Sequence, residues 1–353
     1  MPDTAGAPQA ASSALAVALE RIAPNLEHVE RTMRDQLPAG QAMIGAVGSH
    51  VLSSGGKRLR PALVMLAAEL CGYDGPRRVQ IAAALELLHT ATLLHDDVVD
   101  LADTRRGQAA ARAIWGNRRA ILVGDFFYSR SSSMIVEDGD IDILQIFSDA
   151  IGLMAEGELM QLEKSFDPDV TEAHYYSVID RKSASLIAAS ADSGAVLGGV
   201  TRAERRRVAE FGRELGLAFQ LRDDALDYSA GAEVLGKSPY TDLREGKVTL
   251  PLLLTLKRCE TAQRDAIAGV LKTAQLRAAE LEAEGMRTPE AVIADAELAP
   301  VLDLIARHRG VEDTNRRAFE HVKRAGSAIA PFPDGAAKDA LLGAAHYAAE
   351  RDR

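Results

Sequence analysis

The sequence predicts an all-α protein, an inference that rests on three observations. Only 13 of its 353 residues are prolines, helix-forming alanine, leucine, glutamate and arginine are abundant, and long segments carry apolar residues at helical spacing. The length allows two domains or one large one. Because no linker separates the predicted helices, residues 13–353 are expected to form one helical domain after a disordered tail of residues 1–12.

Helices are expected in succession along the chain. Ser12 or Ser13 is placed to cap the first, which Pro24 should kink before it ends near Leu37. A helix at 41–52 and a glycine-containing loop follow, and Pro61 suits the first position of the next helix. The further predicted helices are 62–70, 76–100, 119–136, 141–164, 171–197, 201–228, 250–258, 261–285, 288–309, 311–329 and 336–353.

Composition argues against several classes of protein. A net charge of -10, from 41 basic and 51 acidic residues, does not suit a general nucleic-acid-binding surface. The two cysteines, Cys71 and Cys259, lack metal-binding spacing and are expected to be buried thiols in a reducing compartment. No export signal or transmembrane stretch is recognised, so we expect a cytoplasmic protein without stable membrane insertion.

The predicted helix 76–100 ends in three aspartates, Asp96, Asp97 and Asp100. Because Asp96 and Asp100 are four residues apart, they lie on one helical face and can share a metal ion. Hard carboxylate oxygens suit magnesium that also binds phosphate. The helix is long enough, at about 37 Å, to be a central element of the fold.

A second acidic cluster ends the predicted helix 201–228 and repeats this spacing, with Asp223, Asp224 and Asp227. Gln220 lies one turn earlier, and the spacing places all four side chains on one face. A single cluster is commonly a solvated helix end. However, like charges that follow apolar sequence repel one another unless a cation joins them. The two clusters together therefore indicate two metal-binding faces.

Basic residues suited to a diphosphate occur in several loops and turns. Each alone is commonly a surface charge, so only the combination is informative. They are Lys57, Arg58 and Arg60 on a Gly-Gly turn, Arg105 and Arg106 just after the first acidic cluster, Lys182, Lys237 and Lys247. Two acidic faces and two sets of cations suit one metal-bound diphosphate that leaves and another held by cations alone. The reaction class indicated is ionisation of a carbon–oxygen bond.

In combination, these motifs resemble those of the trans-polyprenyl diphosphate synthases, and the resemblance covers most of the chain. The matching segments are Gly55-Gly56-Lys57-Arg58-Leu59-Arg60-Pro61, His89 with Leu94–Asp100, Arg105-Arg106-Gly107, Gly157-Glu158, Lys182-Ser183, Phe219–Tyr228 and Gly246-Lys247. The resemblance implies an all-helical isoprenoid-synthase fold with a central active-site cavity. It also implies a homodimer that condenses isopentenyl diphosphate with an allylic diphosphate, such as farnesyl diphosphate, using Mg²⁺.

The resemblance also implies roles for individual residues. Asp96, Asp100 and Asp223 would hold magnesium on the allylic diphosphate, supported by Asp97 and Asp227, with Asp224 a further candidate ligand. Arg105, Lys182 and Lys237 would grip that diphosphate, and Lys57, Arg60, His89 and Arg106 the isopentenyl diphosphate, with Arg58 and Lys247 as further candidates. Gln220 would face the forming cation beside Phe219, and Ser183 replaces a more usual threonine. Thr241 stands where the family has a carboxylate, which questions an outer-shell role in metal binding there.

Product length is predicted from the helix that precedes Asp96. Thr92 and Ala91 lie about 6 to 7.5 Å below it, with Leu88 one turn further, and none is an aromatic plug. In short-chain relatives a bulky aromatic typically fills such a position, so we expect a long, quinone-side-chain type of product. Arg351 and Arg353 are expected to be solvated, with closure over the site as the alternative.

Other functions remain open at this point. A geranylgeranyl or farnesyl diphosphate synthase would differ in product length alone. A class I terpene cyclase would share the acidic face but has no use for a second anion site. A non-catalytic partner subunit would be expected to have lost an acidic cluster, and both clusters are present.

Overall fold

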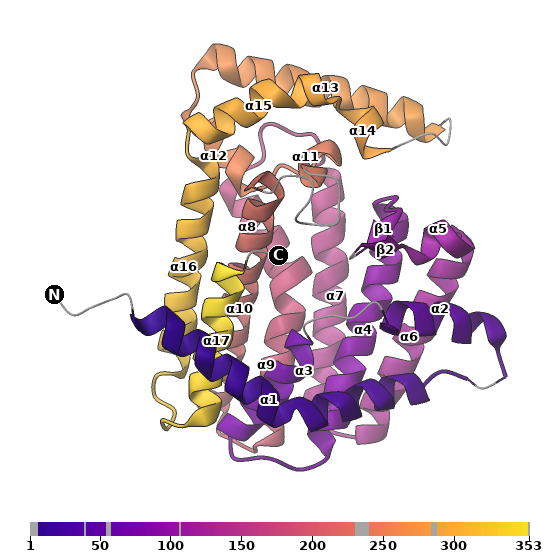
Figure 1. Ribbon diagram of the computed structural model, residues 1–353, viewed down its shortest axis with the longest axis vertical. Coiled ribbons are helices and arrows are strands. Elements are labelled where there is room, and N and C mark those ends of the chain that lie inside the picture. The colour runs from indigo at the N-terminus through magenta and orange to yellow at the C-terminus, as the bar shows by residue number, and fades with distance from the viewer. Residues whose placement is uncertain are drawn as a thin grey trace.

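A computed structural model describes residues 6–38, 40–53, 58–105, 107–229, 240–283 and 288–351. The chain forms a bundle of long helices, several of them nearly parallel, with a smaller helical layer across one end (Figure 1). One continuous apolar core joins most of the helices. Among the described helices, none is both long and apolar enough to cross a membrane. The expected all-α fold is therefore confirmed.

The bundle is built around helices that run along its length (Figure 1). α4 packs on α6, α9 packs on α3 and α10, and α10 packs on α16. Their bounds are α3 (Leu59–Leu70), α4 (Arg77–Val99), α6 (Asn117–Asp138), α7 (Ile141–Glu163), α8 (Glu172–Ile179), α9 (Ser185–Leu197), α10 (Arg202–Ser229) and α16 (Gly310–Ile329). Because α4 and α10 end in the two acidic clusters, this arrangement carries both clusters to one end of the bundle.

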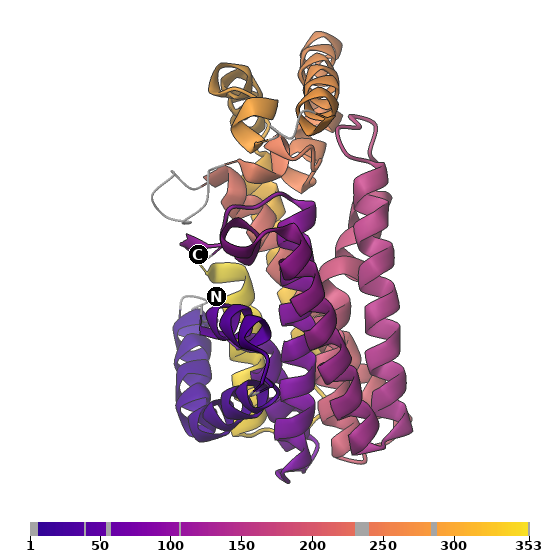
Figure 2. The same ribbon diagram turned by 90° about the vertical axis from the view of Figure 1, so that its right-hand side faces the viewer.

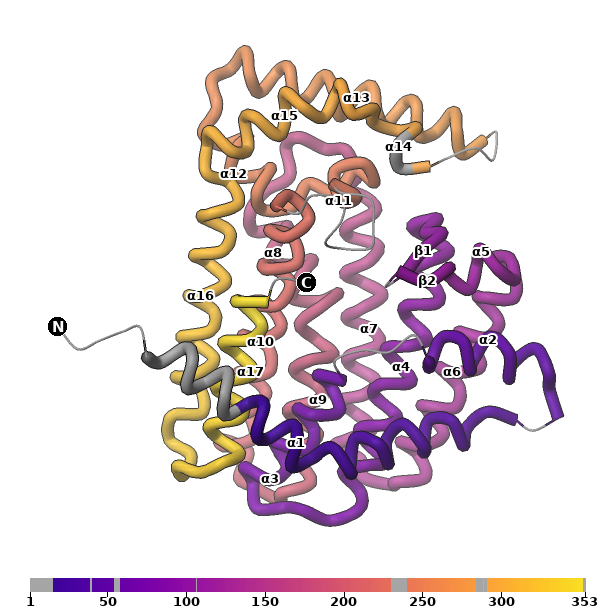
Figure 3. The backbone as a smooth tube through the Cα atoms, in the orientation of Figure 1, coloured from indigo at the N-terminus to yellow at the C-terminus, as the bar shows by residue number. Residues whose placement is uncertain are grey.

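The N-terminal helices lie on the outside of the bundle. α1 (Gly6–Asp35) crosses it near its lower end and packs on α17 (Ala336–Glu350), as the backbone traces show in two orientations (Figures 2 and 3). α1 includes Pro24 and begins before the predicted Ser12, while residues 1–5 of the predicted tail lie outside the described residues. α2 (Ala42–Ser53) follows and contacts α6.

A second layer covers the end of the bundle that carries the acidic clusters. α13 (Thr261–Ala283) and α15 (Asp295–Arg307) lie across this end (Figures 1 and 2). Shorter elements complete the layer and the nearby loops. They are α5 (Ala111–Trp115), α11 (Thr241–Arg244), α12 (Leu250–Arg258), α14 (Pro289–Val292) and an antiparallel pair, β1 (Thr104–Arg105) and β2 (Gln108–Ala109).

Most predicted helices are confirmed to within a few residues, but two are interrupted. The predicted helix 288–309 is divided into α14 and α15 by residues 293 and 294, and the predicted helix 171–197 contains a wider turn. Between α8 and α9 the chain forms a π-helical segment, η1 (Asp180–Ala184). The wider turn inserts an extra residue, which rotates the side chains that follow relative to those before. Lys182 and Ser183 lie in this segment. Cys71 and Cys259 are free and only partly buried, rather than fully buried as expected.

Candidate active site

A cavity of about 1310 Å³ lies inside the bundle. At one end its lining is polar, with Asp96 from α4 and Asp223 from α10 among the wall residues. The rest of the lining is mostly apolar and comes from α1, α3, α4, α6, α7, α9 and α17. The cavity is larger than the usual 300 to 1,000 Å³ of small-ligand pockets. Its size and lining therefore suit a ligand with an ionic head and a long apolar tail.

The direction of each aspartate on α4 follows from its position on the helix. At about 100° per residue, Asp100 lies about 40° from Asp96 around the axis, whereas Asp97 lies about 100° away. Asp97 is 3% exposed and accepts a 2.6 Å bond from Arg105 Nε. Burial raises the pKa of Asp96 to about 6, and the nearby carboxylates Glu158 and Asp100 act in the same direction. The ionised form of Asp96 is therefore unfavourable by itself, and a cation bound beside it would stabilise that form.

The second cluster shows the same division of directions. Asp223 lines the cavity, but Asp224 is 2% exposed and accepts bonds from Tyr175 Oη at 2.5 Å and Gln220 Nε2 at 2.7 Å. The four side chains predicted on one face therefore do not all face the cavity. Asp227 accepts the backbone N–H groups of residues 241 and 242 at 3.1 and 3.2 Å. Burial, reinforced by the carboxylate of residue 242, raises the pKa of Asp224 to about 7 and that of Asp227 to about 8.

Two lysines approach these carboxylates from other elements. Lys182 Nζ lies 2.5 Å from Glu158 Oε2 and 2.8 Å from Gln161 Oε1, both on α7. Lys247 Nζ lies 3.3 Å from Asp100 Oδ1 and 2.5 Å from Glu245 Oε2. Burial acts to lower the pKa of Lys247, but Glu245 and Asp100 together raise it well above its usual value. Lys247 is thus a charged lysine that joins the loop after α11 to the end of α4.

The predicted anion-binding residues near α3 are only partly described. Arg60 and His89 line the cavity together with Arg58. The Arg58 guanidinium donates to Glu30 and Glu86, each at 3.1 Å. These protein acceptors account for Arg58, so it holds the start of α3 to α1 and α4 rather than pointing a free cation into the cavity. Lys57, Arg106, Lys237 and Arg353 lie outside the described residues.

Arg351 was expected to be solvated, but it is 9% exposed and lines the cavity. One guanidinium nitrogen forms an ion pair with Asp223, and the group stacks 3.7 Å from the centre of the Phe219 ring. The Arg351 carbonyl in turn accepts a 2.8 Å bond from Arg222 on α10. In this structure the arginine therefore stands where a cation would neutralise Asp223.

The apolar wall corrects one prediction about product length. Thr92 and Leu88 line the cavity, whereas Ala91 is 2% exposed and is not part of the lining. The reason is helical geometry, because Ala91 is five residues before Asp96 and lies about 140° from it around α4, while Thr92 lies about 40° away. Of the three residues predicted to control product length, Thr92 and Leu88 therefore line the cavity and Ala91 does not.

The residues present fit magnesium in a particular way. Among the described residues, no three carboxylate, histidine or cysteine side chains converge to hold one ion by themselves. Instead, Asp96 and Asp223 face one cavity from two helices. Mg²⁺ commonly binds one or two carboxylates and completes its shell with substrate phosphate and water. The donor set suits an ion that arrives with a diphosphate.

Sequence reasoning missed several residues that complete the site. Glu158, Gln161 and Glu245 are the partners of the two lysines, and Tyr175 is the partner of Asp224. Glu158 carried a signal, because it belongs to the Gly157-Glu158 motif and Gln161 follows it by three residues on the same helical face. Tyr175 carried no such signal, because its contact with Asp224 joins residues 49 positions apart in the sequence.

Charged side chains and a mostly apolar wall share one large cavity inside an all-helical bundle, an arrangement that suits an enzyme for substrates with an anionic head and a long hydrocarbon tail. Residues 41–284 match the family described as "Polyprenyl synthetase". The chain is 41% identical over 334 residues to octaprenyl diphosphate synthase of Escherichia coli K12, which covers 95% of this chain and 98% of the relative.

Solved structures are similar in sequence and in fold. Polyprenyl synthase from Caulobacter crescentus CB15, complexed with calcium and isoprenyl diphosphate, is 35% identical with a TM-score of 0.86 over 100% of both chains. Decaprenyl diphosphate synthase from Rhodobacter capsulatus is 33% identical, with a TM-score of 0.84 over 95% of this chain and 98% of that one. The chain belongs to the polyprenyl synthetase family and is a prenyltransferase.

Proposed function

We propose that the enzyme condenses isopentenyl diphosphate head-to-tail with an allylic diphosphate to give a long, all-trans polyprenyl diphosphate. The observation that carries this proposal is the 1310 Å³ cavity, which is lined by Asp96 and Asp223 and by a mostly apolar wall. On α4, the wall positions below Asp96 are Thr92 and Leu88, neither of which is aromatic. The octaprenyl and decaprenyl diphosphate synthases among its relatives support a long product.

In this proposal Asp96, Asp100 and Asp223 hold Mg²⁺, with Asp227 in support. Bound Mg²⁺ would neutralise the charge that develops on the departing allylic diphosphate. The Caulobacter relative, which was crystallised with calcium and isoprenyl diphosphate, supports a site for a divalent cation and a diphosphate. Asp97 and Asp224 are assigned supporting roles, because each is buried and bonded to another side chain.

The protein's own residues bind and orient the two substrates. Lys182 and Arg105, with Lys237, bind the allylic diphosphate, while Arg60 and His89 bind isopentenyl diphosphate with Lys57 and Arg106. The allylic carbon–oxygen bond breaks, the isopentenyl double bond forms the new carbon–carbon bond, and a proton passes to the released diphosphate. Ser183 donates a 2.6 Å bond to Gln220 Oε1, and Gln220 donates to Asp224, which orients the Gln220 amide beside the forming cation. Lys247, paired with Asp100, holds that carboxylate in place.

The active enzyme is proposed to be a homodimer. Helices α6 and α7 carry large apolar side chains that are exposed in the single chain, including Leu122 and Leu159, each 61% exposed. Several large apolar side chains exposed together on neighbouring helices are typical of a protein–protein interface. Light scattering of the wild type and of the double substitution Leu122→Glu, Leu159→Glu tests this, and a wild-type mass of one chain would contradict it.

The decisive experiment is one incubation with labelled isopentenyl diphosphate, farnesyl diphosphate and Mg²⁺. Chromatography of the dephosphorylated products should show a long all-trans prenol, and chelation of Mg²⁺ should abolish it. A cyclic hydrocarbon formed without isopentenyl diphosphate would contradict the proposal and favour a terpene cyclase. Absence of extension by the isolated chain would favour a non-catalytic subunit. The cytoplasmic location stays a prediction.

A further inference from the structure

The π-helical segment η1 carries Lys182 and Ser183, the residues that the proposed function places beside the allylic diphosphate. A π turn is rare, usually short and frequent at functional sites. If η1 relaxed into a regular α-helix, its turn would contain one residue fewer. The side chains on the N-terminal side of the change would then be rotated by about 100° around the axis relative to α9. The aim of Lys182 therefore depends on whatever holds η1 in its present register.

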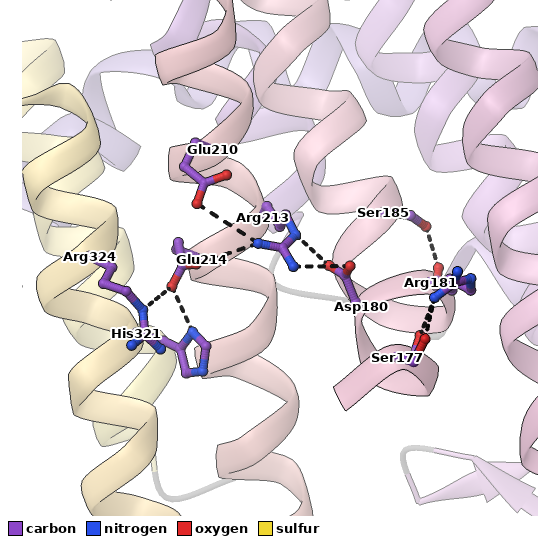
Figure 4. Close-up of polar contacts among 9 residues, drawn as sticks. All are labelled: Ser177, Asp180, Arg181, Ser185, Glu210, Arg213, Glu214, His321 and Arg324. Atoms are coloured by element: carbon purple, nitrogen blue, oxygen red, sulfur yellow. Dashed lines mark hydrogen bonds and ion pairs between the residues drawn. The ribbon is translucent and has the colours of Figure 1, made fainter. Parts of the chain in front are cut away.

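The first residue of η1 is held by an arginine from α10. Arg213 Nε donates to Asp180 Oδ1 at 2.7 Å, and Arg213 Nη2 donates to Asp180 Oδ2 at 3.1 Å (Figure 4). This two-bond geometry fixes orientation as well as distance. Neither residue lines the cavity. The pair can therefore act on substrate only through the segment that it anchors.

Arg213 is in turn surrounded by acceptors that connect it to α16. Its Nη1 atom lies 3.7 Å from Glu214 Oε1, and Glu214 Oε2 lies 2.6 Å from His321 Nδ1 and 2.8 Å from Arg324 Nε (Figure 4). Glu214 is 4% exposed, so this end of the network is inside the protein. The ion pair that anchors η1 is thus connected through Glu214 to α16, which packs along α10.

Two glycines let the neighbouring helices approach the backbone of η1. A Cβ atom on Gly157 of α7 would lie 2.6 Å from the Lys182 backbone nitrogen. A Cβ atom on Gly216 of α10 would lie 2.6 Å from the Ala184 Cα atom. The π turn is therefore in close contact with both helices, and Ser185 Oγ adds a 2.5 Å bond to the Arg181 carbonyl (Figure 4).

We propose that Asp180 and Arg213 are positioning residues for the prenyl-transfer reaction, which hold the π-helical register that aims Lys182 and Ser183 at the allylic diphosphate. The inference rests on the proposed function for the identity of that ligand. It differs from a purely structural role, in which the ion pair would only join η1 to α10.

The chain contains a matched control for this distinction. Arg205 on α10 binds Asp192 on α9 in the same two-bond manner, with distances of 2.7 and 3.2 Å. The side chains of this pair are 26% and 16% exposed, against 43% and 30% for Arg213 and Asp180. Because the Arg205–Asp192 pair is more buried than the Arg213–Asp180 pair, breaking it should lower the stability of the protein by at least as much. The Arg205–Asp192 pair lies outside η1, so breaking it should leave the position of Lys182 unchanged.

The experiment compares Arg213→Gln, Asp180→Asn and Arg205→Gln in the full-length enzyme. We expect Arg213→Gln and Asp180→Asn to lower kcat/KM for farnesyl diphosphate by about tenfold or more, since small misplacements of binding groups can cost up to 100-fold. KM for isopentenyl diphosphate should remain within twofold of the wild type. Arg205→Gln should keep both constants near wild type while lowering Tm by a similar or larger amount. Arg213→Lys, which can keep one of the two bonds, should recover part of the lost kcat/KM.

A second readout does not depend on activity. Hydrogen exchange of the backbone amides of residues 180–184, measured without substrate, should be faster in Arg213→Gln than in Arg205→Gln. If Arg213→Gln matches Arg205→Gln in both kinetics and exchange, the pair is structural and the inference is overturned. Failure of the wild type to extend farnesyl diphosphate would instead overturn the proposed function.

Discussion

The position of Thr92 and Leu88 on α4 leads to a quantitative prediction about product length. Both side chains line the cavity below Asp96. Replacing either with phenylalanine should place a ring across the path of the growing chain and stop elongation early. The two substitutions differ only in depth, so the difference between their products tests whether the cavity is the elongation tunnel.

The expected difference follows from helix and chain dimensions. Thr92 and Leu88 are four residues apart, so the two rings would differ in depth by about 6 Å at 1.5 Å per residue. One isoprene unit adds four chain bonds of about 1.5 Å, or about 5 Å of extended length. Thr92→Phe should therefore give a main product about one isoprene unit shorter than that of Leu88→Phe, and both should be shorter than the wild-type product.

The assay is chromatography of dephosphorylated products made from labelled isopentenyl diphosphate with geranyl or farnesyl diphosphate as starter. A plug at Thr92 should impair the longer starter more strongly, because its tail reaches deeper into the cavity. Leu88→Met, which conserves volume at the same position of the wall, is the control and should keep the wild-type product length. Our account of the tunnel is refuted if Thr92→Phe keeps the wild-type length, or if Leu88→Phe gives the shorter product of the two.

Three further predictions concern charge and packing. The pKa of Asp227 is raised to about 8, whereas an aspartate in the unfolded chain loses its proton near pH 4. Between these values the folded protein holds one more proton than the unfolded chain, so its stability should fall as pH rises from 6 to 8.5. Thermal unfolding in chelator should show this fall, Asp227→Asn should reduce it, and an increase in Tm with pH would contradict it. Arg351→Gln removes the ion pair to Asp223 and should lower Tm in chelator. If Arg351 competes with magnesium for Asp223, the substitution should also lower the magnesium concentration that gives half-maximal activity. A higher magnesium requirement would contradict this competition. Gly157→Ala should lower the free energy of unfolding in urea by about 1 to 3 kcal/mol through overpacking, whereas Gly152→Ala on the same helix, where a Cβ atom meets nothing within 4 Å, should be neutral or stabilising.

Much of the fold could be predicted because the long helices have strong local signals. The predicted helix 76–100 is α4 at Arg77–Val99, and the predicted helix 141–164 is α7 at Ile141–Glu163. Apolar periodicity and turn residues determine such segments almost independently of their neighbours. The acidic clusters were likewise visible, because the spacing of aspartates on a helix is a property of the sequence alone.

The remaining features depend on contacts between distant segments. The η1 interruption lies against Gly157, Gly216 and Arg213, which come from two other helices. Arg351 was expected to be solvated because terminal charges usually are, and only the arrival of α17 beside α10 explains its burial. The separate directions of Asp97 and Asp224 follow from helical geometry, but their partners Arg105 and Tyr175 are known only from the fold.

The large apolar cavity also has a kinetic consequence. A bundle with 1310 Å³ of space inside it lacks part of its core, and a hydrocarbon chain that enters supplies the missing contacts. Burial of each five-carbon unit is worth up to about 4 kcal/mol, from about 0.8 kcal/mol per buried carbon. Longer chains should therefore dissociate more slowly, and departure of the finished lipid should limit turnover. Detergent micelles or lipid vesicles, which offer the chain another apolar environment, should then accelerate the steady state but not the first turnover.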